Sequence, residues 1–263
     1  MFTADNYVLA ESIEQAHQLN QAKNATIVGG MLWLKMSKKH YKTVIDLSEL
    51  GLNKIEENEQ EFSIGCMVTL RQLELHEGLN KVFDHCFTKA VEHIVGVQFR
   101  NGATIGGSVY GRYGFSDILT MLMVLDTYVE LYEGGIVSLS EFAKQPYDND
   151  ILLRIIVKKE DLKVSYMTQR LSETDFPILA CGVSKNVDGY KIAIGARPKK
   201  AVLAESKLSL DATKEEVMTE SKRIAESLRF ESNLRGSKEY RKRLCEVLIS
   251  RSIEELTGGT YEN

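Results

Sequence analysis

The stretch that most constrains how this chain can fold runs from Arg100 to Asp117, RNGATIGGSVYGRYGFSD. Its glycine pair, Gly106-Gly107, is followed by small and aromatic residues and then by the apolar segment ILTMLMVLDTYVEL. We expect a strand end, a tight glycine turn, an open loop, and a buried helix that leads into a strand. Adjacent glycines let a backbone approach a ligand closely, and successive N–H groups in a turn bind anions such as phosphate. Asp117 suits a ribose or another hydroxyl-bearing part of the same ligand.

An earlier stretch, ATIVGG, ends in a second glycine pair, Gly29-Gly30. A glycine pair between two apolar runs is more often a plain turn than a binding site, so one pair alone is weak evidence. Two such stretches in one chain favour the ligand-binding interpretation.

Composition argues against several classes of protein. The 263 residues carry a formal charge of −4 and show no basic stripe with interleaved aromatic residues, so nucleic-acid binding is not expected. No apolar run reaches the roughly 18 residues that a membrane span needs. The first residues lack the basic flank and apolar core of a signal peptide. We therefore expect a cytoplasmic protein without a membrane span.

The cysteines and histidines show no metal-binding spacing. Cys66, Cys86, Cys181 and Cys245 are scattered without a CxxC pair, and we expect four reduced, buried thiols. An iron–sulfur cluster needs clustered thiolates, so none is expected in this chain. The histidines form no HxH or HExxH pattern, so no metal site is predicted.

The first 50 or so residues resemble a small β-α-β unit. An amphipathic helix is predicted over 12–23, with Ser12 as N-cap and Gln15 completing a capping box. A buried strand over 25–28 leads into the first glycine pair, and another strand covers 43–47.

The middle of the chain alternates strands and helices. Hydrophobic periodicity and turn residues predict a strand over 62–66, a helix from Thr69 to about 75, a helix over 82–95, a hairpin at Gly134-Gly135, a short helix within 138–145 and a strand over 150–160.

The predicted pattern of strands and helices changes near residue 160. Residues 164–208 predict three strands with a hairpin at Asp188-Gly189, and two amphipathic helices follow over 212–228 and 237–256. The polar tail 257–263 is expected to be frayed. This last part has the pattern of a compact antiparallel α+β domain.

These motifs together resemble a known family. ATIVGGMLWLKM is similar to the first flavin loop, and RNGATIGGSVYGRYGFSD to the second, in the FAD-binding medium subunits of molybdenum hydroxylases, which include enzymes like xanthine dehydrogenase and carbon monoxide dehydrogenase. DGYKIAIGARPKKAVLAE and LRGSKEYRKRLCEVLISR resemble the C-terminal domain of those subunits, in which a run like RGS-x-x-YR before a final helix is typical. The resemblance covers nearly the whole chain.

The resemblance implies an α+β fold. It is the PCMH-type FAD-binding fold of two α+β subdomains, here residues 1–55 and 56–160. A C-terminal antiparallel three-stranded sheet with helices follows in 161–263, similar to the C-terminal domain of carbon monoxide dehydrogenase flavoproteins.

The resemblance also implies a function and partners. Such a subunit binds FAD and works in a hetero-oligomer with a molybdopterin-binding large subunit and a 2Fe-2S small subunit. Electrons reach FAD from the clusters and leave to NAD⁺ or another acceptor. The substrate, oxidised in the large subunit, is expected to be a purine such as xanthine or hypoxanthine, or another N-heterocycle. No catalytic side chain is expected in this chain, because the redox chemistry belongs to the flavin.

Site residues follow from the resemblance position by position. Backbone N–H groups would wrap the FAD diphosphate at Val28, Gly29, Gly30, Met31, Leu32 and Trp33. A second wrap, with Ile105 near the flavin ring, would be formed by Thr104, Ile105, Gly106, Gly107 and Ser108. Asp117 would bind hydroxyl groups of the cofactor, and Ile94 and Leu152 would supply apolar contacts.

This chain departs from the family pattern at several of these positions. Met31 and Leu32 replace a hydroxyl residue and an acid, Ser108 stands where Asn is usual, and the loop 110–115 has no proline. A lysine expected near the flavin falls at Met167 or Thr168, and Arg170 is the only cation nearby. These changes leave FAD binding expected and make reactivity with NAD⁺ less certain.

Other interpretations stay open. One alternative is a stand-alone flavin oxidoreductase of related fold, such as the enolpyruvyl-sugar reductase of cell-wall synthesis. Another is a flavin-free assembly subunit. Trp33 fits core packing better than an adenine contact, and Tyr110 and Tyr113 could shield the flavin or simply line a loop. Lys199-Lys200 and the run 241–243 are expected at the surface or in subunit contacts.

Overall fold

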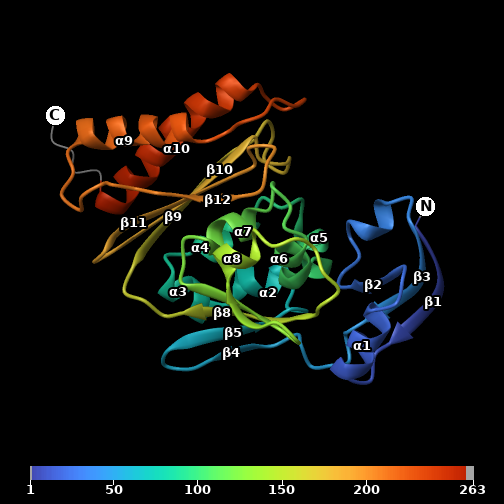
Figure 1. The fold of residues 1–263 in the computed structure, drawn as a ribbon. Coiled ribbons are helices and arrows are strands. Elements are labelled where there is room, and N and C mark those ends of the chain that lie inside the picture. The colour runs from blue at the N-terminus through green and yellow to red at the C-terminus, as the bar shows by residue number, and fades with distance from the viewer. Residues whose placement is uncertain (1, 259–263) are drawn as a thin grey trace. The chain divides into compact units, whose positions relative to one another are not determined.

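The structure is a computed structural model that describes residues 2–258, and its chain divides into two compact units (Figure 1). The first unit takes in the chain up to residue 73, then 96–111 and 127–158. The second takes in 74–95, 112–126 and the chain from 159 onward. Each unit is therefore assembled from separate stretches of sequence. The tail expected to be frayed, 257–263, begins with a helical Thr257 and its C-cap Gly258, and residues 259–263 lie outside the described residues.

The first unit begins with a three-stranded parallel sheet. Its order is β1-β3-β2, with β1 at Thr3–Leu9, β2 at Ala25–Val28 and β3 at His40–Asp46. Helix α1 (Ile13–Asn20) packs on it and begins as expected, because the Gln15 N–H donates to the Ser12 Oγ at 3.2 Å. The reciprocal bond comes one residue early, from the Glu11 N–H to the Gln15 side chain at 2.7 Å. Strand β1 was not predicted, because its mostly exposed side chains show no apolar alternation.

A five-stranded antiparallel sheet forms the rest of the first unit, in the order β4-β5-β8-β6-β7. Its strands are β4 (Ile55–Glu57), β5 (Glu61–Gly65), β6 (Thr127–Leu131), β7 (Gly135–Ser138) and β8 (Leu152–Lys158). Helices α5 (Val97–Gly102), α6 (Ile105–Tyr110) and α8 (Leu139–Phe142) belong to this unit, and α2 (Leu70–Leu75) begins in it. The predicted strands at 62–66 and 150–160, the helix after Thr69 and the hairpin at Gly134-Gly135 are confirmed within one to three residues.

A four-stranded antiparallel sheet organises the second unit, in the order β12-β11-β10-β9. Its strands are β9 (Lys163–Gln169), β10 (Leu179–Asn186), β11 (Gly189–Gly195) and β12 (Val202–Ala204). The predicted antiparallel sheet and the hairpin at Asp188-Gly189 are confirmed, and β12 adds a short fourth strand to the three expected. Helices α9 (Lys214–Ser227) and α10 (Lys238–Thr257) confirm the two predicted C-terminal helices.

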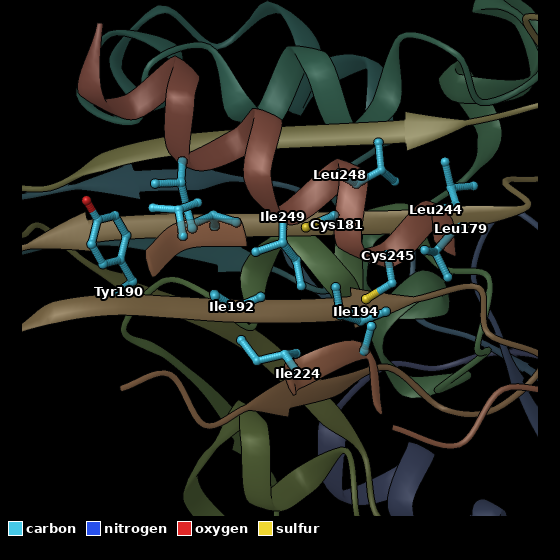
Figure 2. Packing of buried hydrophobic residues seen from close by; sticks show 14 of the residues in the cluster. Leu179, Cys181, Tyr190, Ile192, Ile194, Ile224, Leu244, Cys245, Leu248 and Ile249 are labelled. Carbon is cyan, nitrogen blue, oxygen red and sulfur yellow. The ribbon is translucent and has the colours of Figure 1, made fainter. Parts of the chain in front are cut away.

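The apolar core of the second unit lies between this sheet and α10, with α9 alongside (Figures 1 and 2). Figure 2 shows Cys245, Leu248 and Ile249 of α10 over the sheet residues Cys181 and Ile194. Side chains of β10 point alternately to the two faces of the sheet, and those of Leu179, Cys181 and Val183 belong to this core. Burial of such side chains is the main force that holds a helix on a sheet.

The other face of this sheet holds α7 (Asp117–Leu122) through small residues. A Cβ added to Gly195 would lie 2.1 Å from the Oγ1 of Thr120, and one added to Gly182 would lie 3.4 Å from the Thr120 carbonyl oxygen. The Ser184 Oγ donates to the Val124 carbonyl at 2.6 Å. The missing Cβ atoms therefore let the helix approach the strands closely.

The prediction of one helix over 82–95 is wrong. The structure has two short helices instead, α3 (Glu77–Val82) and α4 (Cys86–Val91). Asp84 and His85 between them have left-handed backbones, with φ of +49° and +58°, which end one helix before the next begins. The side chain of Asp84 accepts the Val164 N–H at 3.0 Å, so the break is held by a contact 80 residues away in sequence.

All four cysteines are free and buried, as expected. Burial raises the pKa of Cys66 and Cys181 to about 12. Within residues 2–258, no helix combines the length and apolar character that a membrane crossing requires.

The packing of α7 predicts that Gly195→Ala destabilises the chain. The new Cβ meets the buried Thr120 side chain, and overpacking of this kind costs about 1–3 kcal/mol. Gly96→Ala is the control, because a Cβ there meets nothing within 4 Å. Urea unfolding of both variants measures the difference, and equal losses would contradict the close packing of α7.

Candidate functional site

The first glycine pair forms a turn that presses against a distant part of the first unit. A Cβ added to Gly30 would lie 1.4 Å from the carbonyl oxygen of Gly102, and one added to Gly29 would lie 2.5 Å from the Oγ1 of Thr104. No side chain fits at either place. The two stretches singled out in the sequence are therefore in direct contact.

The same turn offers backbone hydrogen-bond donors. Met31 has a left-handed backbone with a φ of +59°, and such a residue within a turn helps successive N–H groups to face one side. In the described part of the chain, nothing accepts a hydrogen bond from the N–H groups of Gly30, Met31 and Leu32. The turn therefore has the donor set that a phosphate requires.

The second glycine pair is not a tight turn, which corrects the expectation from sequence. Gly106 and Gly107 lie in the first turn of α6, whose N-cap Thr104 accepts the Gly107 N–H at 3.2 Å. The stretch before it is helix α5 rather than a strand end. A Cβ on Gly106 would lie 2.5 Å from the Cys66 carbonyl oxygen, so this glycine allows a close approach within the chain.

The N–H groups of the second stretch are largely used inside the protein. Ile105 donates to the Val68 carbonyl at 2.8 Å, Gly106 to the Cys66 carbonyl at 2.9 Å, and Ser108 to the Thr104 carbonyl at 3.1 Å. The second stretch therefore forms part of the pocket wall, while the backbone N–H groups without an acceptor belong to the turn at Gly30.

Both stretches line one pocket of about 250 Å³. The expected site residues in its wall are Val28, Gly29, Thr104, Gly106, Gly107 and Leu152. Sequence reasoning missed other wall residues, among them Asn20, Cys66, Asp148, Asn149 and Asp150. The run YDND before a buried strand was the one available signal, and it resembles an ordinary turn. Tyr110, left open between shielding and lining a loop, also lies in the wall.

The remaining expected residues of the first unit lie beside this pocket or in the core. Trp33, next to the glycine turn, packs edge to face on Phe99 with ring centres 6.3 Å apart and is 41% exposed. Ile105 is fully buried. The Ser108 Oγ donates to the Thr104 carbonyl at 3.0 Å, which holds it within α6.

Asp117 lies in the second unit, where side chains of the same unit bind its carboxylate. It is the first residue of α7 and is 4% exposed. Its Oδ1 accepts hydrogen bonds from the Arg170 Nη2 at 2.6 Å and the Tyr166 hydroxyl at 2.8 Å. Burial raises the pKa of the Asp117 carboxyl, while Arg170 and Tyr166 act to lower it. Burial and the nearby Asp117 raise the pKa of Tyr166 well above its usual value.

The alternation of β9 decides which side chains reach Asp117. Tyr166 and Thr168 lie on one face, and the Arg170 Nε donates to the Thr168 Oγ1 at 3.2 Å. Met167 lies on the opposite face and packs against the core under α10. Of the two positions left open by the sequence, Thr168 is therefore the one beside the Asp117–Arg170 pair. Ile94, half-buried, follows α4 in the same unit.

Further arginine side chains hold the loops next to the Asp117–Arg170 pair. Arg170 also donates to the Asp175 carbonyl at 2.6 Å, and Arg235 binds the Asp175 carboxylate at 2.9 Å while lying over the ring of Phe176. Arg241 is fully buried, which corrects its expected surface position. It donates to the carbonyls of Ile178 and Glu231 and to the Asn233 side chain, and so holds the loop that carries Arg235.

The chemistry of the first-unit pocket suits ligand binding. Its wall combines apolar residues and a few polar side chains, and the unpartnered backbone donors of the Gly30 turn follow directly on the wall residue Gly29. This arrangement suits a phosphate-bearing cofactor with an apolar part. Among residues 2–258, no group of three or more His, Cys, Asp or Glu side chains is placed to hold a metal ion.

The close approach of α6 predicts unequal effects at neighbouring glycines. Gly106→Ala places a Cβ 2.5 Å from a backbone oxygen and should lower the free energy of unfolding by about 1–3 kcal/mol. Gly107→Ala meets only the Thr104 Oγ1 at 3.2 Å and should be far milder, because alanine also favours the helix. Urea unfolding compares them, and a milder Gly106→Ala would contradict the packing described.

The buried ion pair predicts strong coupling between Asp117 and Arg170. Arg170→Met leaves a buried carboxylate without its cation and should cost about 3–5 kcal/mol. Adding Asp117→Asn should recover part of that loss, because the uncompensated charge is removed. A double-mutant cycle by urea unfolding measures the coupling, and simple additivity would argue against the pair.

Comparisons with known proteins point to one family. The family model described as the FAD binding domain in molybdopterin dehydrogenase matches residues 2–159. The model described as the CO dehydrogenase flavoprotein C-terminal domain matches residues 165–256.

Curated relatives match most of the chain or about half of it. The uncharacterized protein YgfM of Escherichia coli K12 is 23% identical over 253 residues, which is 94% of each chain. The 6-hydroxypseudooxynicotine dehydrogenase complex subunit alpha of Paenarthrobacter nicotinovorans is 27% identical over 133 residues, 47% of this chain and 44% of that protein.

Solved structures share the fold. A chain of quinoline 2-oxidoreductase from Pseudomonas putida 86 aligns with a TM-score of 0.85 at 19% identity over 99% of this chain and 98% of that one. A chain of carbon monoxide dehydrogenase from Hydrogenophaga pseudoflava aligns with a TM-score of 0.88 at 20% identity over 96% and 97%. The chain thus belongs to the FAD-binding subunits of the molybdenum hydroxylase family, and its cofactor is FAD.

Proposed function

We propose that this subunit passes electrons through FAD, from the 2Fe-2S clusters of a small partner subunit to NAD⁺ or another acceptor. A large partner subunit with molybdopterin would oxidise the substrate. The observation that supports this most is the contact between the two glycine stretches, which places free backbone donors beside a pocket of about 250 Å³. Bound FAD supplies the redox chemistry.

The chain's own residues would bind and orient the cofactor. The N–H groups of Gly30, Met31 and Leu32 would hold the diphosphate, and the family's missing hydroxyl and acid at positions 31 and 32 do not remove these backbone donors. Val28 and Leu152 would give apolar contacts from the pocket wall. Ile94, Asp117 and Met167 stay predictions as cofactor contacts, as does the division into 1–55, 56–160 and 161–263.

We also propose an N-heterocycle as the substrate of the large subunit, with a purine such as xanthine as the first candidate. The name of quinoline 2-oxidoreductase, a protein of the same fold, supports the wider class. The cytoplasmic location stays a prediction.

The alternatives differ in what they require. A stand-alone flavin oxidoreductase would use side chains near the flavin to protonate and hold a substrate. Asp117, the acid that the family resemblance places at the cofactor, is engaged with Arg170 and Tyr166 instead. A flavin-free assembly subunit would not need the free donors of the Gly30 turn.

The proposal predicts a flavin spectrum. The purified chain, supplied with FAD, should show absorption bands at about 450 nm, and anaerobic NADH should bleach them if nicotinamide is the acceptor. Dithionite is the control, since it reduces any accessible flavin.

Each outcome points to one function. Bands that dithionite bleaches but NADH does not would keep the flavin subunit and favour another acceptor. A chain that stays colourless with added FAD, despite an intact fold by circular dichroism, would overturn the proposal in favour of the assembly subunit.

A further inference from the structure

The segment before β8 gives the pocket a wall of hydrogen-bond acceptors. Asp148, Asn149 and Asp150 all line the pocket. The Asn149 carbonyl accepts from the side chains of Asn20 at 2.7 Å and Gln21 at 3.0 Å, so it is already engaged.

The two carboxylates of this wall differ in what remains free. The Asp150 carboxylate accepts three backbone N–H groups at 2.7–3.1 Å, from Glu133, Gly134 and Ile151, and so serves the fold. Asp148 accepts the Tyr110 hydroxyl at 2.9 Å and the Asp150 N–H at 3.2 Å, both on Oδ1. Within the described residues, nothing donates to its second oxygen, Oδ2.

Tyr110 fixes the position of Asp148. Its hydroxyl lies 2.7 Å from the Asp148 carbonyl and 2.9 Å from Oδ1, and its ring packs near Phe142 with centres 6.0 Å apart. Tyr110 is the last residue of α6, the helix that carries the second glycine pair. The glycine helix and the acceptor wall are thus joined by one side chain.

We propose that Asp148 accepts hydrogen bonds from sugar-type hydroxyl groups of the bound cofactor. This rests on the proposed function and adds a residue to its site. A carboxylate only accepts hydrogen bonds, so it favours hydroxyl groups and repels phosphate. The Gly30 turn has the opposite preference, because it offers N–H donors. The pocket and the turn next to it therefore form a polarised site, with the diphosphate at the turn and neighbouring hydroxyls at Asp148.

A cation site fits these atoms less well. Cations such as Ca²⁺ and Mg²⁺ need several oxygen ligands, and the Asp150 carboxylate is already engaged by three backbone N–H groups. One free carboxylate oxygen matches a ligand hydroxyl instead.

The test measures FAD affinity in the full chain after its flavin has been removed. Asp148→Ala should weaken FAD binding about tenfold, because a hydrogen bond between a charged group and the ligand is lost. Asp148→Asn keeps one acceptor oxygen and should lose less. Tyr110→Phe keeps the ring in the pocket wall and removes only the hydroxyl that positions Asp148, so it should also lose less. Asp188→Asn, an exposed turn residue between β10 and β11, is the control and should bind like the wild type.

FAD carries hydroxyl groups on its ribose and on its ribityl chain, and competition separates the two sources. ADP offers only the ribose and FMN only the ribityl chain. ADP and FMN each compete with FAD for the wild-type chain and for Asp148→Ala. The compound that loses affinity in the variant contains the hydroxyl groups that Asp148 contacts.

Three results would overturn the assignment while leaving FAD binding in place. One is unchanged FAD affinity in Asp148→Ala. Another is tighter binding, which would mean that the carboxylate merely repels the phosphates. The third is a weaker FAD affinity together with a lower melting temperature of the flavin-free variant, which would mean that Asp148 stabilises the fold rather than contacts the cofactor. A wild-type chain that binds no FAD would instead overturn the proposed function itself.

Discussion

The pocket depends on the approach of Gly30 to the carbonyl of Gly102, which leaves no room for a Cβ. This contact brings a turn of the parallel sheet against the end of α5, and the neighbouring Gly29 meets Thr104, which caps α6. Any side chain at position 30 would separate the donors of the turn from the wall formed by α6. The binding surface is thus a consequence of two backbones that touch where side chains normally keep them apart.

Several local signals were read correctly from the sequence, while features that depend on distant contacts were not. The cap at Ser12 and the hairpins at Gly134-Gly135 and Asp188-Gly189 depend on a few adjacent residues, and the structure has them. The pair Gly106-Gly107 looks the same in a turn and in a closely packed helix, so its helical position could not be inferred. Asp148 was missed because its position depends on Tyr110, 38 residues earlier in the chain.

The family resemblance located Asp117 and Arg170 separately, and the structure joins them. They lie 53 residues apart in sequence and form a buried pair with Tyr166. The cation that the sequence offered in place of the family's lysine is therefore partly neutralised by the acid expected to serve the cofactor. The typical RGS-x-x-YR run also has a physical reason, since Arg235 and Arg241 hold the loops beside this pair.

The two units are interleaved along the chain, and this constrains how the protein can be made and cut. Helices α4 and α7 are encoded before residue 123, yet they pack against strands that come after residue 162. A ribosome therefore releases the first unit's last strand, β8, while the helices of the second unit still lack their sheet. A fragment that stops near residue 160 would expose the apolar faces of those helices, and the remaining fragment would expose one side of its sheet. The boundary between the two family domains in sequence is consequently no place to divide the folded molecule.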